Sequence, residues 1–161
     1  MPTIEILAAG DAPSPVALSV LTDLATRTIT RALPHSLQGT TVQIEYSIVS
    51  DAEIQKLNQQ YRAVDKVTDI LSFGDADTPG FYTTTNGGVV FLGQLALNHD
   101  YLVHGAEEDG VSLEHEWVFV FVHGVLHLLG FDHSPEMFFI QDTVTEEWVR
   151  ETRVATSKTQ D

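Results

Sequence analysis

Three histidines lie close together in the segment WVFVFVHGVLHLLGFDH, which runs from Trp117 to His133. His123 and His127 are four residues apart, and His133 follows six residues later. On a helix, side chains four positions apart lie on one face, so the first two imidazoles can bind one metal ion. A glycine just past an apolar helix often adopts the left-handed conformation, and Gly130 would turn His133 back to the same ion. Three histidine ligands leave one tetrahedral position open, as in catalytic zinc sites.

Two histidines at this spacing on an apolar helix are also compatible with ordinary buried neighbours. However, three of the chain's seven histidines fall within eleven residues of its most apolar segment. Burying three imidazoles without a common partner would be costly. The sequence therefore predicts a metal site formed by His123, His127 and His133. Nitrogen ligands make one zinc ion per chain the first choice, although nickel, cobalt or copper would also bind such a set.

The spacing also matches the extended zinc-protease pattern H-E-x-x-H-x-x-G-x-x-H. In those proteases the glutamate after the first histidine is the general base, and here that position is Gly124. The ligand pattern is kept while the protease base is absent, which argues against a peptidase. Gly124 would allow either a close approach to the metal or tight packing of the helix, and we favour packing.

Two segments of the sequence are similar to the signature segments of one known family. Residues 123–133, HGVLHLLGFDH, are similar to the signature H-G-x-L-H-L-x-G-Y-D-H, with Phe131 in place of the usual tyrosine. Residues 57–73, LNQQYRAVDKVTDILSF, resemble the segment L-N-x-x-Y-R-x-x-D-x-x-T-D-V-L-S-F. The two blocks stand in the expected order, about fifty residues apart. Together they resemble the YbeY family of bacterial metal-dependent endoribonucleases.

The resemblance implies a zinc-dependent endoribonuclease specific for single strands. Its expected role is ribosomal RNA maturation, at the 3′ end of 16S rRNA, and ribosome quality control. The implied partners are RNA, the small ribosomal subunit and its assembly factors. Two alternatives stay open: a ribosome-assembly factor whose metal is structural, and a metallohydrolase of another class, such as a peptidase. Either a metal-activated water or the 2′-hydroxyl of the RNA could be the nucleophile.

The candidate catalytic residues are Arg62, His123 and Asp132. The resemblance implicates the arginine at position 62 in activity, and an arginine fork suits the paired oxygens of a phosphodiester. From composition alone, the favoured interpretation of Arg62 and Lys66 is a pair of solvated cations at a helix C-terminus, and the resemblance supports a role for Arg62 more than for Lys66. Asp132 would either orient a ligand imidazole by accepting its hydrogen bond or cap the turn.

The chain departs from the family pattern at two further positions. Gly74 replaces the proline that tends to follow Ser-Phe, and Gln94 replaces the aspartate of a Gly-Asp pair. Any role of that aspartate near the site would be missing here. Three other histidines, His99, His104 and His115, lack metal spacing with the three ligands and are expected on the surface or at helix caps.

Composition narrows the class of protein. The 161 residues are 43% hydrophobic, which is typical of one globular domain. Cysteine is absent, so neither disulfides nor thiolate metal sites can form. The N-terminal segment lacks the pattern of a signal peptide, and the apolar residues 117–129 are too few to span a bilayer. These features predict a cytoplasmic protein that does not enter a membrane.

The charge is unusual for a nuclease. The formal net charge is −15, and none of the eight lysines and arginines lies between Lys66 and Arg150. Nucleic-acid-binding proteins usually carry a basic patch. RNA contacts would therefore depend on the metal, on a few basic residues or on a partner, and tight non-specific binding is not expected.

Hydrophobic periodicity predicts the elements that must position these residues. The expected strands cover residues 3–7, 42–48, 69–73 and 89–97. The first expected helix runs from Ser14-Pro15 to about residue 34. A second follows a Ser50–Glu53 capping box, and a short third covers residues 99–105. The fourth runs from Ser112 through the metal motif, and the last begins at Ser134-Pro135. Residues 74–88 are expected to form a turn-rich loop, and 106–110 an acidic turn.

The resulting prediction is an α+β fold. A small mixed sheet of about four strands packs with about five helices, and the central buried helix carries the metal motif. Residues 1–152 are expected to form a single domain, and residues 153–161 a frayed C-terminal tail.

Overall fold

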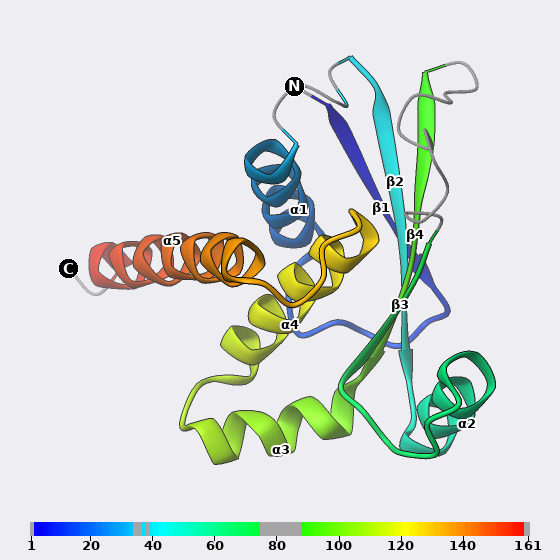
Figure 1. Cartoon of the computed structure of the whole chain (residues 1–161). Coiled ribbons are helices and arrows are strands. Elements are labelled where there is room, and N and C mark those ends of the chain that lie inside the picture. Colours follow the sequence, from blue (N-terminus) through cyan, green and yellow to red (C-terminus); the bar gives the residue numbers. More distant parts are fainter. Residues whose placement is uncertain (1, 34–36, 38, 75–87, 160–161) are drawn as a thin grey trace.

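Four apolar or alternating segments form one mixed sheet, on which the helices pack (Figure 1). The structure is a computed structural model that describes residues 2–33, 37, 39–74 and 88–159. The strands are β1 (Thr3–Ala9), β2 (Thr41–Val49), β3 (Ile70–Gly74) and β4 (Val89–Asn98), in the sheet order β1-β2-β4-β3. The first three strands in this order are parallel, and β3 pairs antiparallel with β4 at the edge.

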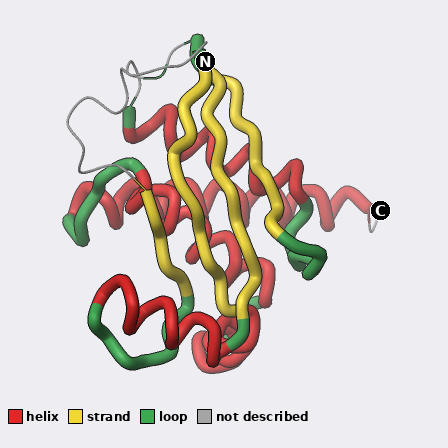
Figure 2. Tube along the Cα trace, turned by 90° about the vertical axis from the view of Figure 1, so that its right-hand side faces the viewer, coloured by secondary structure: helices red, strands yellow, loops and turns green. Residues whose placement is uncertain are grey.

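The helices divide between the two faces of the sheet (Figures 1 and 2). They are α1 (Leu18–Ala32), α2 (Asp51–Arg62), α3 (His99–Asp109), α4 (Leu113–Leu128) and α5 (Pro135–Thr159). Helices α1, α4 and α5 lie together on one face, and α2 packs on the other face over the end of β3 and β4. This arrangement confirms the predicted α+β fold with a small mixed sheet.

Helix α4 is the central helix because it is apolar on nearly every side. Trp117 and Phe121 are fully buried, and the helix contacts α1, α3, α5, β3 and β4. Its start is set by Ser112, whose side chain accepts a hydrogen bond from the backbone N–H of His115. The predicted capping box of α2 is also confirmed, since Ser50 and Glu53 bond reciprocally. The position of the metal motif is therefore fixed by the core itself.

Two predicted helix limits were wrong. Helix α1 begins at Leu18 rather than after Ser14, because the Ser14 hydroxyl bonds locally to the backbone of Val16, whose side chain is buried. Helix α3 continues through the expected acidic turn to Asp109 and ends at Gly110, which has φ +67°. The burial of Ala106 on the same face as Leu102 explains the longer helix.

Helix α5 is joined to α1 by ion pairs. Arg27 forms a pair of hydrogen bonds with Glu151, and Arg31 contacts Glu147. The helix continues through residues 153–159, where a frayed tail was expected. Helix α5 is continuous across residue 152, where the domain was expected to end. That domain limit stays a prediction. The expected loop of residues 74–88 lies, from 75 to 87, outside the described residues.

Candidate metal centre

The three predicted ligands converge on one point. His123 and His127 lie one turn apart on α4, and their Nε2 atoms are 3.0 Å from each other. Gly130 has φ +95°, as predicted, and turns the chain so that the Nε2 of His133 lies 3.4 Å from that of His123. Two nitrogens on one tetrahedral zinc, at about 2.0–2.1 Å each, lie about 3.3–3.4 Å apart. The nitrogen separations therefore fit a zinc-sized ion.

The hydrogen-bond partners of two ligands orient their lone pairs inward. The Nδ1–H of His127 donates to the backbone carbonyl of Phe131 at 2.9 Å, and the Nδ1–H of His123 donates to Oε1 of Gln141 at 3.1 Å. A carbonyl oxygen can only accept, so the proton of each neutral ring lies on Nδ1 and its Nε2 carries a lone pair. Two lone pairs facing each other at 3.0 Å require a cation or proton between them.

Burial disfavours a proton on His127. Its pKa lies below the ordinary value because burial penalises the charged ring and the neighbouring His123 adds to the effect, although the Phe131 carbonyl opposes it. A neutral imidazole is the form that binds metals. His127 is therefore prepared as a ligand near neutral pH.

The lowered pKa of His127 predicts a pH dependence for the metal-free protein. In the unfolded chain histidine takes up a proton below about pH 6.5, whereas folded His127 resists it. The free energy of unfolding is therefore expected to fall as the pH drops from 7.5 to 5.5, because the unfolded state binds more protons. Urea unfolding at both pH values measures the fall, and His127→Gln should reduce it. An equal fall in the variant would contradict the assignment.

Gln141 is a site residue that the sequence analysis did not identify as such. It lies on α5, eighteen residues from His123, and its side chain is buried. Its Nε2 donates to the carbonyl of Phe119 at 3.3 Å, which orients Oε1 toward the histidine. Gln141 falls in the helix expected after Ser134-Pro135, but nothing in the sequence indicates which residue its amide would meet.

Removing the Gln141 amide is expected to weaken metal binding. Outer partners of ligand histidines typically account for about 10- to 100-fold in metal affinity, so Gln141→Leu should raise the metal dissociation constant by that factor. Gln141→Glu keeps an acceptor oxygen and should lie closer to the parent. Competition with a chromophoric chelator measures both, with Thr143→Ala, on the same helix, as a control. Unchanged affinity in Gln141→Leu would show that the bond has no influence on the ligand.

The three histidines open into a cavity of about 550 Å³. Arg62, the last residue of α2, lines the same cavity although it is 61 residues from His123 in sequence. Ser72 of β3 and Asp132 line it too. The site is thus open, and the three histidines and Arg62 line the same cavity.

Asp132 lies at the mouth of this cavity and is exposed. Burial lowers the pKa of His127, and the Asp132 carboxylate is the last of the groups that act on it, in the opposite direction. The oriented rings of His123 and His127, however, donate to Gln141 and Phe131. A role of Asp132 in catalysis or orientation stays a prediction.

Gly124 packs against the sheet. A Cβ there would lie 2.6 Å from the Cδ1 atom of Ile70 and 2.9 Å from a Cδ atom of Leu95. The side of the helix at this position therefore faces the core rather than the cavity. This supports packing as its role, and it leaves no room for the protease glutamate.

Gly124→Ala is expected to destabilise the protein. Overpacking a core typically costs about 1–3 kcal/mol, which outweighs the gain of up to about 1 kcal/mol from better helix propensity. Urea unfolding should show the loss. Gly105→Ala is the matched control, because the Cβ there would meet the end of the flexible Glu116 side chain at 2.9 Å. Equal stability of Gly124→Ala and the parent would contradict the packing role.

The other predicted positions lie away from this cluster. Among the described residues, the group of metal-ligating side chains consists of the same three histidines. His104 is exposed, while His99 and His115 pack near Trp117 and Trp148. These two rings are half-buried rather than on the surface, because each lies at the start of a helix beside a tryptophan.

Gln94 and Lys66 do not line the metal cavity. Gln94 lies on the face of the sheet opposite α4, and its Nε2 bonds to Glu45 at 3.4 Å. Replacing the family aspartate with Gln94 therefore changes the opposite face of the sheet. In the described part of the chain, no helix is both long and apolar enough to cross a membrane.

Comparisons with known proteins point to one family. A family model described as "Endoribonuclease YbeY" matches residues 13–148. A protein of that name from Roseiflexus sp. (strain RS-1) is 43% identical over 93 residues, which is 58% of each chain. A second from Aliarcobacter butzleri is 40% identical over 95 residues, covering 59% of this chain and 63% of its own length. These alignments cover less than two thirds of either relative.

A solved structure extends the similarity to nearly the full length. The solution structure of a protein from Thermotoga maritima is 29% identical, with a TM-score of 0.54. The match covers 97% of this chain and 95% of the other. Since the family model also extends over most of the chain, this protein belongs to the YbeY family.

Proposed function

We propose that the protein is a zinc-dependent endoribonuclease that cleaves single-stranded RNA. One observation carries the proposal: the three histidines and Arg62 line one cavity. Relatives that match this chain bear the name "Endoribonuclease YbeY". We further propose that its substrate is ribosomal RNA, at the 3′ end of 16S rRNA, and that it acts in ribosome quality control in the cytoplasm.

His123, His127 and His133 would hold the metal through Nε2. A zinc ion so held would supply Lewis acidity and would activate water near neutral pH. Gln141 and the Phe131 carbonyl keep the Nε2 atoms of two of the rings turned toward the point where the three histidines meet. Arg62 binds two phosphate oxygens and stabilises the charge that develops on them. Asp132, at the mouth of the cavity, is proposed to position the RNA or a ligand ring.

The alternatives fit the site less well. A structural zinc is usually enclosed by four protein ligands, whereas three histidines here face an open cavity of about 550 Å³. A peptidase of the related pattern needs a glutamate at position 124, where a Cβ would be too close to Ile70 and Leu95. We place the activity in a single domain, residues 1–152, and leave residues 153–161 outside it, although helix α5 continues to residue 159. The proposed partners are the small ribosomal subunit and its assembly factors.

The proposal is tested with zinc-loaded protein and labelled single-stranded and duplex RNA of the same sequence. We expect internal cleavage of the single strand, loss of activity with chelator, and recovery when zinc is added back. Cleavage that persists in chelator would indicate a contaminating nuclease. A protein that binds one zinc ion and leaves every RNA intact would favour the assembly factor.

A further inference from the structure

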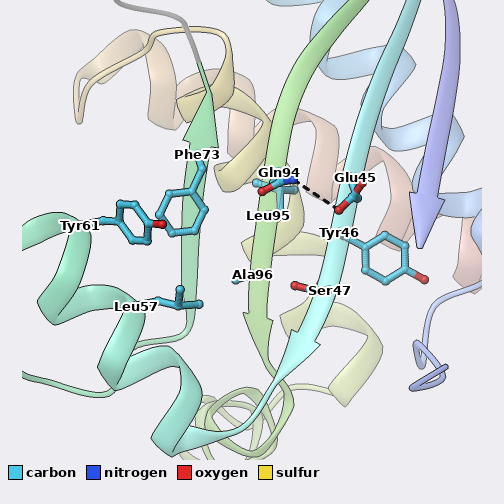
Figure 3. Close-up of a pocket in the computed structure, with 9 residues that line it drawn as sticks. All are labelled: Glu45, Tyr46, Ser47, Leu57, Tyr61, Phe73, Gln94, Leu95 and Ala96. Carbon is cyan, nitrogen blue, oxygen red and sulfur yellow. Dashed lines mark hydrogen bonds between the residues drawn. The ribbon is translucent and has the colours of Figure 1, made fainter. Parts of the chain in front are cut away.

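A second cavity lies on the face of the sheet opposite α4, between α2 and the strands (Figure 3). Its volume is about 230 Å³. Pockets for drug-sized ligands usually measure about 300–1,000 Å³, so this one suits a single planar ring system. It is lined by Glu45, Tyr46, Ser47, Leu57, Tyr61, Phe73, Gln94, Leu95 and Ala96.

Two aromatic rings form one wall of this cavity. Tyr61, on the last turn of α2, is 61% exposed, and its ring meets that of Phe73 edge to face, with centroids 5.1 Å apart. Phe73 is anchored by packing against the small core of Ile54, Leu71 and Ala96. The packed ring of Phe73 therefore holds the exposed ring of Tyr61 in place. Exposed aromatic rings of this kind are the surfaces on which unpaired bases stack.

The other side of the cavity is polar. The side chains of Glu45 and Gln94 point toward each other there, joined by a hydrogen bond of 3.4 Å (Figure 3). Ser47 lines the cavity beside them. Proteins that read single-stranded RNA stack a base on an aromatic ring and bond to its polar edge. A carboxylate accepts from amino groups, so this edge suits a base with an exocyclic amino group.

The second cavity and the metal cavity are lined by residues that are consecutive in the sequence. Tyr61 and Arg62 are consecutive at the end of α2, and the tyrosine lines the second cavity while the arginine lines the metal cavity. Likewise, Ser72 lines the metal cavity and Phe73 lines the second cavity, because successive side chains of a strand point to opposite faces of the sheet. Strand β3 is the edge of the sheet. An RNA strand passing around this edge would reach both cavities.

Three exposed basic residues lie beside this edge. Arg27 and Arg31 are engaged by carboxylates of α5. Lys56, Arg62 and Lys66, on α2 and the segment after it, are exposed and form no ion pair within the described ranges. A protein with a net charge of −15 has little general attraction for RNA, and stacking adds affinity that does not depend on charge.

We infer that this cavity holds one unpaired, amino-bearing nucleobase of single-stranded RNA, stacked on Tyr61, next to the phosphate bound by Arg62. The inference rests on the proposed function, because it supplies a binding subsite for the same substrate. The subsite would give a preference for single strands a physical cause, because a base in a duplex would first have to break its pair and its stack, which costs free energy.

The test uses zinc-loaded protein and a short 2′-O-methyl oligoribonucleotide carrying 2-aminopurine, whose fluorescence is quenched by stacking. The parent should quench the probe. Tyr61→Ala should lose the quenching and bind about 10-fold more weakly, within the roughly 5- to 150-fold that stacking one base contributes. Tyr61→Phe keeps the ring and should behave as the parent. The control is Tyr101→Ala, which removes a tyrosine ring on α3 that is 46% exposed.

The outcomes separate this inference from the proposed activity. Binding with quenching that depends on Tyr61, without cleavage of natural RNA, would support the subsite and contradict the nuclease. If the parent cleaves RNA, and Tyr61→Ala binds and quenches the probe as well as the parent does, the subsite is contradicted and the proposed nuclease activity is not. If the parent binds no RNA, the inference is wrong, and a protein partner becomes the occupant to test.

Discussion

His127→Ala is expected to abolish zinc binding and to lower RNA cleavage more than about 100-fold. Loss of an outer partner of a ligand costs about 10- to 100-fold, and removing the ligand itself should cost more. The imidazole of His127 is half-buried and lies 3.0 Å from that of His123. Alanine leaves two ligands, which cannot hold the ion at ordinary zinc concentrations. The metal content of purified protein and the cleavage rate are measured on the same samples.

The matched control for this variant is His104→Ala. His104 is exposed on α3, and its Nδ1 bonds to the backbone carbonyl of Asp100. It should retain one zinc per chain and full cleavage. Metal-free His127→Ala is expected to remain folded, because α4 is held mainly by Trp117, Phe121 and other apolar residues. Full zinc content in His127→Ala would contradict the three-histidine site.

Arg62→Ala is expected to lower kcat/KM for RNA about 100- to 1,000-fold, the usual result of removing one donor to transition-state charge. Zinc content should not change, since the metal centre in the described residues consists of the three histidines. The loss should appear mainly in kcat, because a guanidinium that meets developing charge acts most strongly in the transition state. Steady-state kinetics with metal analysis separates this from metal loss.

Arg62→Lys is the informative companion. Lysine keeps the positive charge and loses the planar fork that contacts two phosphate oxygens, so its activity should lie between parent and Arg62→Ala. Arg150→Ala, an exposed arginine on α5, should cleave as the parent does. If Arg62→Ala cleaved at the parental rate, the phosphate would have to be bound by other groups lining the cavity.

The local features of the chain could be predicted from the sequence. The three ligands, Ser112 as the cap of α4 and the turn at Gly130 were all predicted, and the structure confirms that the histidines meet. These features depend on helical spacing and on backbone preferences that act over a few residues. The two wrong limits, at Ser14 and at Asp109, were decided by burial of neighbouring side chains, which local signals do not report.

The sequence by itself determined the three histidines that converge, the α+β class and the absence of a protease base. The tertiary structure decided which distant residues join them: Gln141 behind His123, Arg62 in the same cavity, and Gln94 on the opposite face of the sheet. The reason is physical. A four-residue spacing fixes two side chains on one helix, but contacts between elements far apart in sequence depend on how the sheet and helices pack. The cavity beside Tyr61 exists only because α2 packs on β3 and β4.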